Sequence, residues 1–169
     1  WPDVRFNIDV KESWAILPLA RAIQRTRAHD RVCICSFSDR RLEQARKAVG
    51  REICTALGPR GVLALRAASL GNGYGRLLAG LARQGIPCAQ VPAGFRGFPI
   101  ITRSFIRTAH ALGMQVHAWT VDDPATMERL LDLGVDGIMT DNITGLRELL
   151  RARGQWHAGE RQGTRKASA

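Results

Sequence analysis

An aspartate and a lysine stand two residues apart near the start of the chain, in the stretch RFNIDVK. The strict alternation of apolar and polar residues predicts a β-strand over residues 5–11 whose polar side chains, Asn7, Asp9 and Lys11, share one face. A carboxylate and an ammonium group at the mouth of a fold need a reason to be buried there. The pair could place a divalent cation on Asp9 and an anionic ligand on Lys11, or it could be an ion pair at the rim.

Four further side chains stand at or near the ends of expected strands. Gln90 lies near the end of PCAQVP, His117 and Trp119 share one face of VHAWTV, and Asp141 follows the last strand. Functional groups of parallel barrels gather at this carboxyl-terminal edge, so all four are candidates. Three have a simpler interpretation: Trp119 can fill the core, His117 can be a satisfied core residue, and Asp141 can cap the next helix.

The clearest structural unit is the stretch 116–142, VHAWTVDDPATMERLLDLGVDGIMTDN. Its β-branched start predicts a strand, and Asp122-Asp123-Pro124 predicts a helix start with an acidic cap and Pro in the first turn. Apolar residues at three- and four-residue spacing give the helix one buried side, and Gly134 ends it. A second short strand follows, so the stretch is a βαβ unit with parallel strands.

The same unit repeats along the chain. We expect six strands, each followed by a helix, over residues 5–11, 31–37, 52–57, 87–92, 116–121 and 135–140. An open doubly wound sheet and a (β/α)8 barrel both accommodate this order, but no glycine-rich turn follows the first strand, which weighs against a dinucleotide-binding fold. A full barrel takes about 250 residues. The 169 residues, which begin with Trp rather than Met, would hold the last six βα units of a barrel.

Six segments resemble the glycerophosphodiester phosphodiesterase family in order and spacing, over about residues 4 to 150. They are FNIDVK (6–11), CSFSD (35–39), AQVP (89–92), the AH and LG of 109–113, VHAWTVDDP (116–124) and LGVDGIMTD (133–141). The resemblance implies an incomplete (β/α)8 TIM barrel over residues 1–152, followed by a basic tail, 153–169, too polar to pack. It also implies an enzyme of glycerophospholipid metabolism that hydrolyses glycerophosphodiesters to an alcohol and glycerol 3-phosphate with Ca²⁺ or Mg²⁺.

The resemblance assigns roles to individual residues. Asp9 corresponds to an acidic metal ligand and Lys11 to a lysine near the phosphate, where it acts as a catalytic and substrate-binding group. Trp119 corresponds to a tryptophan that packs against the glycerol unit, and Gln90, in the matching AQVP segment, is expected to bind substrate.

Two departures from the family pattern matter. Asp9 stands where Glu is commoner, which shortens the reach by one methylene. The family's front section, with its HRG, ExD and HD motifs, would precede FNIDVK; the four histidines, His29, His110, His117 and His157, all follow it, so none lies in these motifs. Because phosphodiester cleavage needs an acid, a base or nucleophile, and a cation held by several oxygens, we expect these residues alone to be inactive. A non-catalytic remnant is the alternative.

The four cysteines, Cys33, Cys35, Cys54 and Cys88, are expected to be small buried side chains, because no second Cys/His cluster completes a metal site. Reduced thiols, with neither a signal peptide nor a long apolar run, favour a cytoplasmic protein without a transmembrane segment.

The net charge of +10 raises the alternative of a module that binds nucleic acid or an anionic surface. With a single Tyr and no aromatic–basic stripe, solvated helix faces and the basic tail explain the charge better than a specific nucleic-acid site does. The expected partner is therefore a small-molecule glycerophosphodiester, and the sequence leaves the oligomeric state open.

Overall fold

The computed structural model describes residues 3–50, 52–71, 75–95 and 97–156. The strands are β1 (Phe6–Asp9), β2 (Val32–Cys35), β3 (Cys54–Thr55), β4 (Cys88–Pro92), β5 (Gly94–Phe95), β6 (Phe98–Pro99), β7 (Gln115–Trp119) and β8 (Gly137–Ile138). The α-helices are α1 (Ile16–Thr26), α2 (Asp39–Val49), α3 (Pro59–Ala68), α4 (Gly75–Ala82), α5 (Arg103–Ala111), α6 (Pro124–Leu133) and α7 (Ile143–Ala152). Two short 3-10 turns, η1 (Ser13–Ala15) and η2 (His29–Arg31), flank α1.

Local sequence signals set the helix boundaries. Ser38 accepts a hydrogen bond from the Arg41 N–H at 3.4 Å where α2 begins, and Asp123 accepts one from the Thr126 N–H at 2.8 Å where α6 begins. Both side chains satisfy backbone donors that a helix start leaves free. Helix α6 stops at Gly134, whose φ of 98° a glycine adopts without strain. The helix ends expected for the stretch 116–142 are confirmed.

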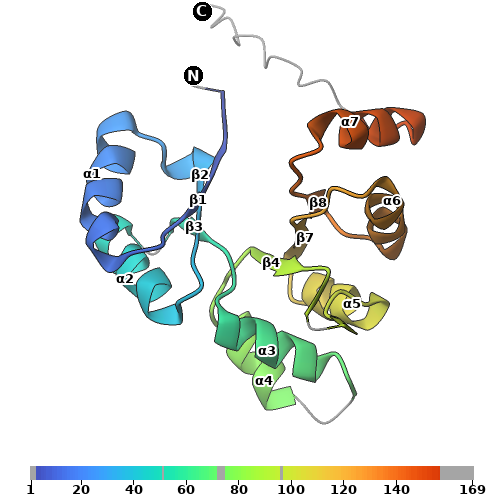
Figure 1. Ribbon diagram of the computed structural model, residues 1–169. Coiled ribbons are helices and arrows are strands. Elements are labelled where there is room, and N and C mark those ends of the chain that lie inside the picture. The colour runs from blue at the N-terminus through green and yellow to red at the C-terminus, as the bar shows by residue number, and fades with distance from the viewer. Residues whose placement is uncertain (1–2, 51, 72–74, 96, 157–169) are drawn as a thin grey trace, which may run out of the picture.

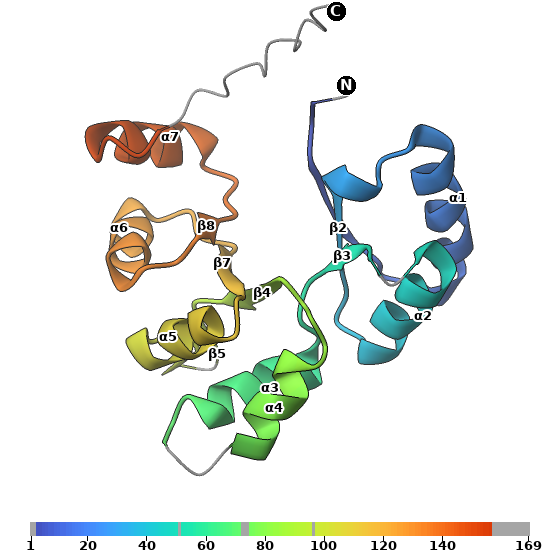
Figure 2. The ribbon, with the colours of Figure 1, turned by 180° about the vertical axis from the view of Figure 1, so that it is seen from behind.

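Six strands run parallel, as two three-stranded sheets in the orders β1-β2-β3 and β4-β7-β8. An isolated parallel bridge between Ala56 and Cys88 joins the two sheets, and the Leu57 N–H donates to the Cys88 carbonyl at 2.8 Å. The strands line the inner side of an open curve with the helices outside, and β1 and β8 stand at its two ends (Figures 1 and 2). Within the described residues the barrel does not close, which confirms the incomplete (β/α)8 arrangement.

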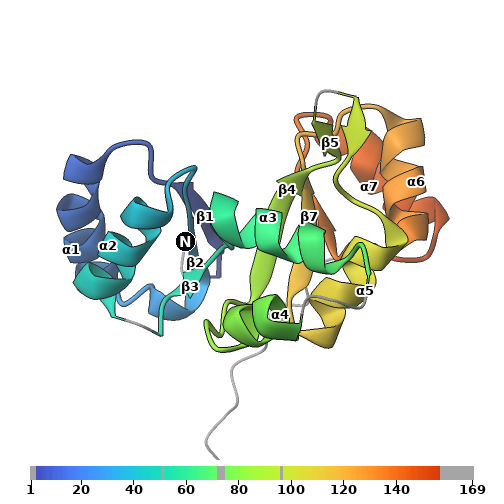
Figure 3. The same cartoon turned by 90° about the horizontal axis from the view of Figure 1, so that it is seen from below.

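Apolar side chains beneath the helices form two clusters rather than one. The smaller lies between β1, β2 and the pair α1 and α2, and includes Val10, Ile23, Ile34 and Leu42. The larger lies around β4 and β7 and is covered by α3 to α6; its most buried members include Leu65, Phe105, Val116, Met127 and Leu130. Seen from below, α3 lies between the two groups of helices (Figure 3). The two clusters follow the division of the sheet.

Three expectations need adjustment. The strand expected over 52–57 shrinks to β3, because the chain changes partners there: the Ala56 N–H donates to Ile34 in β2 and the Leu57 N–H to Cys88 in β4. The loop expected over 93–99 contains the short hairpin of β5 and β6. Helix α3 starts at Pro59 rather than at Val62, consistent with the preference of Pro for the first helical turn.

The chain after α7 stays in contact with the body for a few residues. The Arg153 guanidinium pairs with the Asp132 carboxylate at 2.8 Å, and the backbone N–H groups of Gln155 and Trp156 donate to the Leu150 carbonyl. The rest of the expected basic tail, residues 157–169, lies outside the described residues. None of the described helices has the length and apolar character that a membrane span requires.

Candidate active site at the carboxyl-terminal ends of the strands

An ion pair and two aromatic rings meet where β1, β2 and β7 end. Lys11 donates to the Asp9 carboxylate oxygen Oδ2, so these two charges, two positions apart in the sequence, pair with each other. The Lys11 ammonium also lies 5.4 Å from the centre of the Phe37 ring, and Phe37 packs edge-to-face on Trp119 with a centroid distance of 5.6 Å. The structure therefore brings Asp9, Lys11 and Trp119 to one rim, which we call the mouth, with Phe37 as the link.

The two oxygens of Asp9 differ in their environment. Oδ2 holds Lys11, while Oδ1 is buried and accepts no hydrogen bond from any described residue. Leaving a carboxylate oxygen buried without a partner is costly, so this atom suits a cation or a donor. Ca²⁺ and Mg²⁺ need about six oxygen ligands, and no group of three or more acidic or histidine side chains surrounds Asp9 in the described parts of the chain. Asp9 fits such an ion as one ligand among several, and the described residues do not supply the others.

Hydrogen bonds behind the mouth fix the two loops that carry Lys11 and Phe37. The Val10 N–H donates to the Cys35 carbonyl at 2.8 Å, and the Ser36 hydroxyl donates to the Val10 carbonyl at 2.7 Å. The Arg41 guanidinium in turn donates to the Ser36 hydroxyl oxygen at 2.9 Å. The side chain of Lys11 is 71% exposed above this network, so its backbone is held while its ammonium can move.

Asp122 ties the loops after β7 and β8 together on the far side of the mouth. Its Oδ1 accepts hydrogen bonds from the Asp141 N–H at 2.7 Å, the Thr140 hydroxyl at 2.9 Å and the Asn142 N–H at 3.4 Å. These donors, the Asp141 N–H first, hold the pKa of the Asp122 carboxyl below its usual value. Asp141 does not cap the last helix as suggested by the sequence; Asn142 does, by accepting from the Gly145 N–H at 3.0 Å.

Gln90 and His117 lie deeper than the mouth. They are register partners on β4 and β7, one inward-facing position before Pro92 and Trp119, which pair at the strand ends. The side-chain amides of the two residues pair: Gln90 Nε2 donates to Asn7 Oδ1 at 3.0 Å, and Asn7 Nδ2 donates to Gln90 Oε1 at 3.2 Å. The structure thus places Gln90 in the interior rather than beside Asp9.

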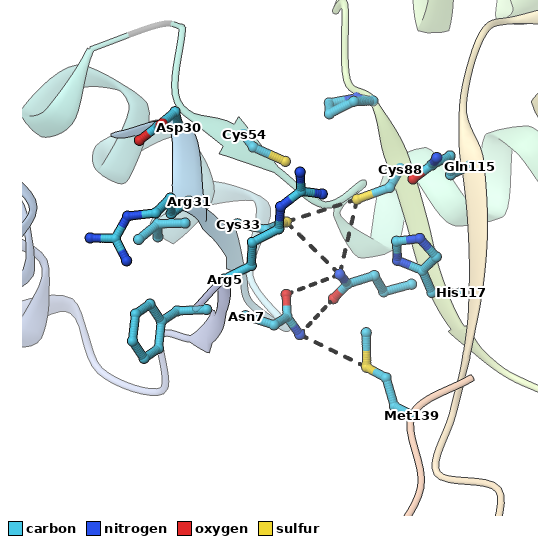
Figure 4. Close-up of a pocket in the computed structure, with 14 residues that line it drawn as sticks. Arg5, Asn7, Asp30, Arg31, Cys33, Cys54, Cys88, Gln115, His117 and Met139 are labelled. Atoms are coloured by element: carbon cyan, nitrogen blue, oxygen red, sulfur yellow. Dashed lines mark hydrogen bonds between the residues drawn. The ribbon is translucent and has the colours of Figure 1, made fainter. Parts of the chain in front are cut away.

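His117 is half-buried, and burial lowers its pKa, against the opposing influence first of Asp136 and then of Cys54. Its ring lines a cavity of about 460 Å³ between the two sheets and makes no hydrogen bond within the described residues, so the satisfied core histidine expected from the sequence is not what the structure contains (Figure 4).

Phe37 was not singled out as a functional residue from the sequence. The indication was available: it is the last residue of the strand expected over 31–37, in the quoted segment CSFSD, at the edge where functional groups gather. The side chain of Phe37 is an exposed large apolar group, with 62% of its surface accessible.

A parallel βα sheet with an acidic residue, a lysine and a tryptophan at its carboxyl-terminal edge defines a TIM-barrel type of site. The chain belongs to the glycerophosphoryl diester phosphodiesterase family, whose family model matches residues 3–144. The family resemblance of the sequence is therefore confirmed.

A curated relative and solved structures of this family are similar to the chain in sequence or in fold. The chain is 45% identical over 156 residues to the Mycobacterium tuberculosis protein named "Probable glycerophosphodiester phosphodiesterase 2", a match that covers 92% of this chain and 58% of that one. A glycerophosphodiester phosphodiesterase from Parabacteroides distasonis has a TM-score of 0.62 at 19% identity, over 90% of this chain and 60% of that one. A solved structure from Agrobacterium tumefaciens has a TM-score of 0.65 at 17% identity, over 89% and 60%. The chain thus spans a little over half the length of these proteins.

Proposed function

We propose that this chain carries the C-terminal part of the active site of a metal-dependent glycerophosphodiester phosphodiesterase. In this proposal the substrate is a small glycerophosphodiester, the products are an alcohol and glycerol 3-phosphate, and the reaction belongs to glycerophospholipid metabolism. The observation that supports it most is the grouping of Asp9, Lys11, Phe37 and Trp119 at one mouth in a chain that belongs to this family.

Lys11 is the catalytic group that this chain offers to the phosphate. In the described structure it neutralises Asp9, but its side chain is mostly exposed and can turn its ammonium toward a bound anion. A lysine ammonium is a compact positive charge with three donors, which suits a phosphate oxygen whose negative charge grows during cleavage. The ion pair and the phosphate contact are then two states of one side chain.

Asp9 offers its buried, unpartnered Oδ1 as one ligand of a Ca²⁺ or Mg²⁺ ion. A divalent cation at this place would stabilise negative charge on the phosphoryl oxygens. Trp119, with Phe37 at right angles to it, gives the glycerol unit an apolar wall, and Gln90 can reach the substrate only from the inner side of the sheet.

The remaining catalytic groups of the family are not found among residues 1–169, which contain neither the HRG nor the ExD motif. We therefore propose that residues 1–169 act together with the family's front section. The four free thiols favour a reducing compartment such as the cytoplasm.

The test is release of glycerol 3-phosphate from glycerophosphodiesters with different alcohols, with and without Ca²⁺ or Mg²⁺. Residues 1–169 alone should be inactive, and a joined chain, in which the family's front section precedes residues 1–169, should be active only with the metal. Equal activity of residues 1–169 alone would contradict the division of the site. A folded joined chain that cleaves none of the substrates would contradict the proposed function.

A further inference from the structure

Three of the four cysteines meet on the inner side of the sheet, although 55 positions separate the first from the last. Cys33 comes from β2, Cys54 from β3 and Cys88 from β4, and their sulfur atoms all lie within 4.8 Å of one another. Figure 4 shows the three side chains converging at the cavity between the two sheets. All three are free thiols.

Strand register produces this cluster. Cys33 and Cys54 are direct partners in β2 and β3, and Cys88 forms the isolated bridge to Ala56, two residues after Cys54. Because side chains alternate along a strand, a register shift of one residue in any of the three strands would send a sulfur to the helix side. The sequence shows no second Cys/His cluster along the chain, and the cluster instead forms across strands.

The sulfur separations suit a shared metal ion better than a disulfide bond. Zinc ligands at about 2.3 Å from the ion, at the corners of a tetrahedron, lie about 3.8 Å from one another. The Cys33 and Cys88 sulfurs are 3.9 Å apart. A disulfide would require them to approach to about 2.05 Å.

A candidate fourth ligand and an outer hydrogen-bond donor lie beside the cluster. The ring of His117 is outside the group of ligand atoms that lie within 4.8 Å of one another, so its side chain would have to turn toward the ion. His117 faces the same cavity, is half-buried, and is close enough to Cys54 for each to affect the other's charge. The neutral form of an imidazole is the one that binds a metal ion. The Gln90 amide nitrogen lies 3.8 Å from the Cys33 sulfur and 4.0 Å from the Cys88 sulfur, where its N–H groups stabilise negative charge on sulfur.

Zinc binding would release the thiol protons of the cluster, since three thiolates bind the ion. Three thiolates, a neutral imidazole and Zn²⁺ leave one negative charge, and Arg5 and Arg31 line the same cavity.

We propose that Cys33, Cys54 and Cys88, with His117 as fourth ligand, form a structural site for one Zn²⁺ ion. This site is separate from the mouth and does not depend on the proposed hydrolase function. Its effect would be mechanical: the ion would cross-link β2, β3, β4 and β7 at the junction where an isolated bridge joins the two sheets.

The first experiment measures zinc binding by the whole chain, reduced and stripped of metal, with a chromophoric chelator as competitor. We expect one Zn²⁺ per chain, and Co²⁺ in its place should give the visible bands of tetrahedral thiolate coordination. Because loss of an outer partner alone costs about 10- to 100-fold in affinity, Cys54→Ser should cost at least about 100-fold. The matched control is Cys35→Ser, on the same strand as Cys33 but outside the cluster, which should bind like the wild type.

A second experiment labels the thiols of the wild type alone, so misfolding of a variant cannot affect the labelling rates. Alkylation of the wild type, followed by mass spectrometry, should show Zn²⁺ slowing the labelling of Cys33 and Cys54 by about tenfold or more, while the rate at Cys35 stays unchanged. Zn²⁺ should also raise the melting temperature of the wild type and of Cys35→Ser, but not of Cys54→Ser. The proposal would be overturned if Zn²⁺ left the labelling rates at Cys33 and Cys54 unchanged. It would also be overturned if Cys54→Ser bound zinc as tightly as the wild type.

Discussion

At the strand ends, Asp9, Lys11, Phe37 and Trp119 form a mouth of charges and aromatic rings. One inward-facing position deeper, the same sheet carries amides, thiols and an imidazole. On β1 Asn7 lies only two positions before Asp9, yet the Asp9 carboxylate keeps a buried oxygen without a partner among the described residues, while Asn7 is paired with Gln90.

The comparison shows how one strand serves two kinds of chemistry. Residues two apart share a face and are about 7 Å from each other along the strand, so each strand contributes to both layers. At the mouth, the Lys11 side chain is mostly exposed, and the Asp9 Oδ1 has no hydrogen-bond partner among the described residues. In the inner layer, the thiols and amides mainly contact one another, which suits a structural role.

The largest effect should come from Asp9→Asn in the joined chain. The change keeps the size and removes the charge that attracts a cation, so activity should fall by about 10³-fold and excess Ca²⁺ or Mg²⁺ should partly restore it. Metal titration of glycerol 3-phosphate release measures both effects. Glu128→Gln, which neutralises an exposed carboxylate on α6, is the control. Near-full activity of Asp9→Asn with an unchanged metal requirement would show that Asp9 binds no catalytic cation and forms only an ion pair with Lys11 at the rim.

Lys11→Met should have the next largest effect. It keeps the apolar stem and removes the ammonium, so kcat/KM should fall by about 100-fold. The metal concentration at half-maximal activity should stay the same, because the lysine is assigned to the phosphate rather than to the ion. Lys47→Met, which removes a surface ammonium paired with Glu43 on α2, is the matched control. A large shift in metal requirement for Lys11→Met would show that its main role is to set the charge of Asp9.

Trp119→Ala should act on binding more than on the chemical step. It removes the wall that Phe37 packs against, and an aromatic contact of this kind is worth about 1 kcal/mol, so KM should rise by about fivefold with a small change in kcat. Phe37→Ala should show the same direction. A fall in kcat at unchanged KM would mean that the rings position the catalytic groups instead.

The smallest effect should come from Asp122→Asn and should depend on pH. The native pKa of Asp122 is lowered, so its contribution to stability is present above the unfolded-state pKa and is lost as pH falls through the native pKa. Melting temperatures measured from pH 7 to pH 3 should therefore show the wild type above the variant at neutral pH, with the difference closing in acid. A difference that is independent of pH would show that shape, rather than charge, holds the two loops.

The sequence by itself determined the local structure. The alternation of RFNIDVK gave the correct inner and outer faces of β1, and capping residues such as Ser38 and Asp123, with Gly134 as terminator, set helix ends close to those observed. These features depend on neighbours within a few residues, so composition and spacing are enough to predict them. The pairing of Asp9 with Lys11 was foreseeable for the same reason, as one of two interpretations.

Only the tertiary structure decided which distant residues meet. It brought Phe37 onto Trp119 and moved Gln90 from the mouth to the inner side of the sheet beside Asn7. It also gathered Cys33, Cys54 and Cys88, which the sequence suggested were unrelated small core residues. The physical reason for the amide and thiol contacts is strand register: it is set by packing and hydrogen bonds across the whole sheet, and a shift of one residue in a strand would turn its inward-facing side chains to the opposite face.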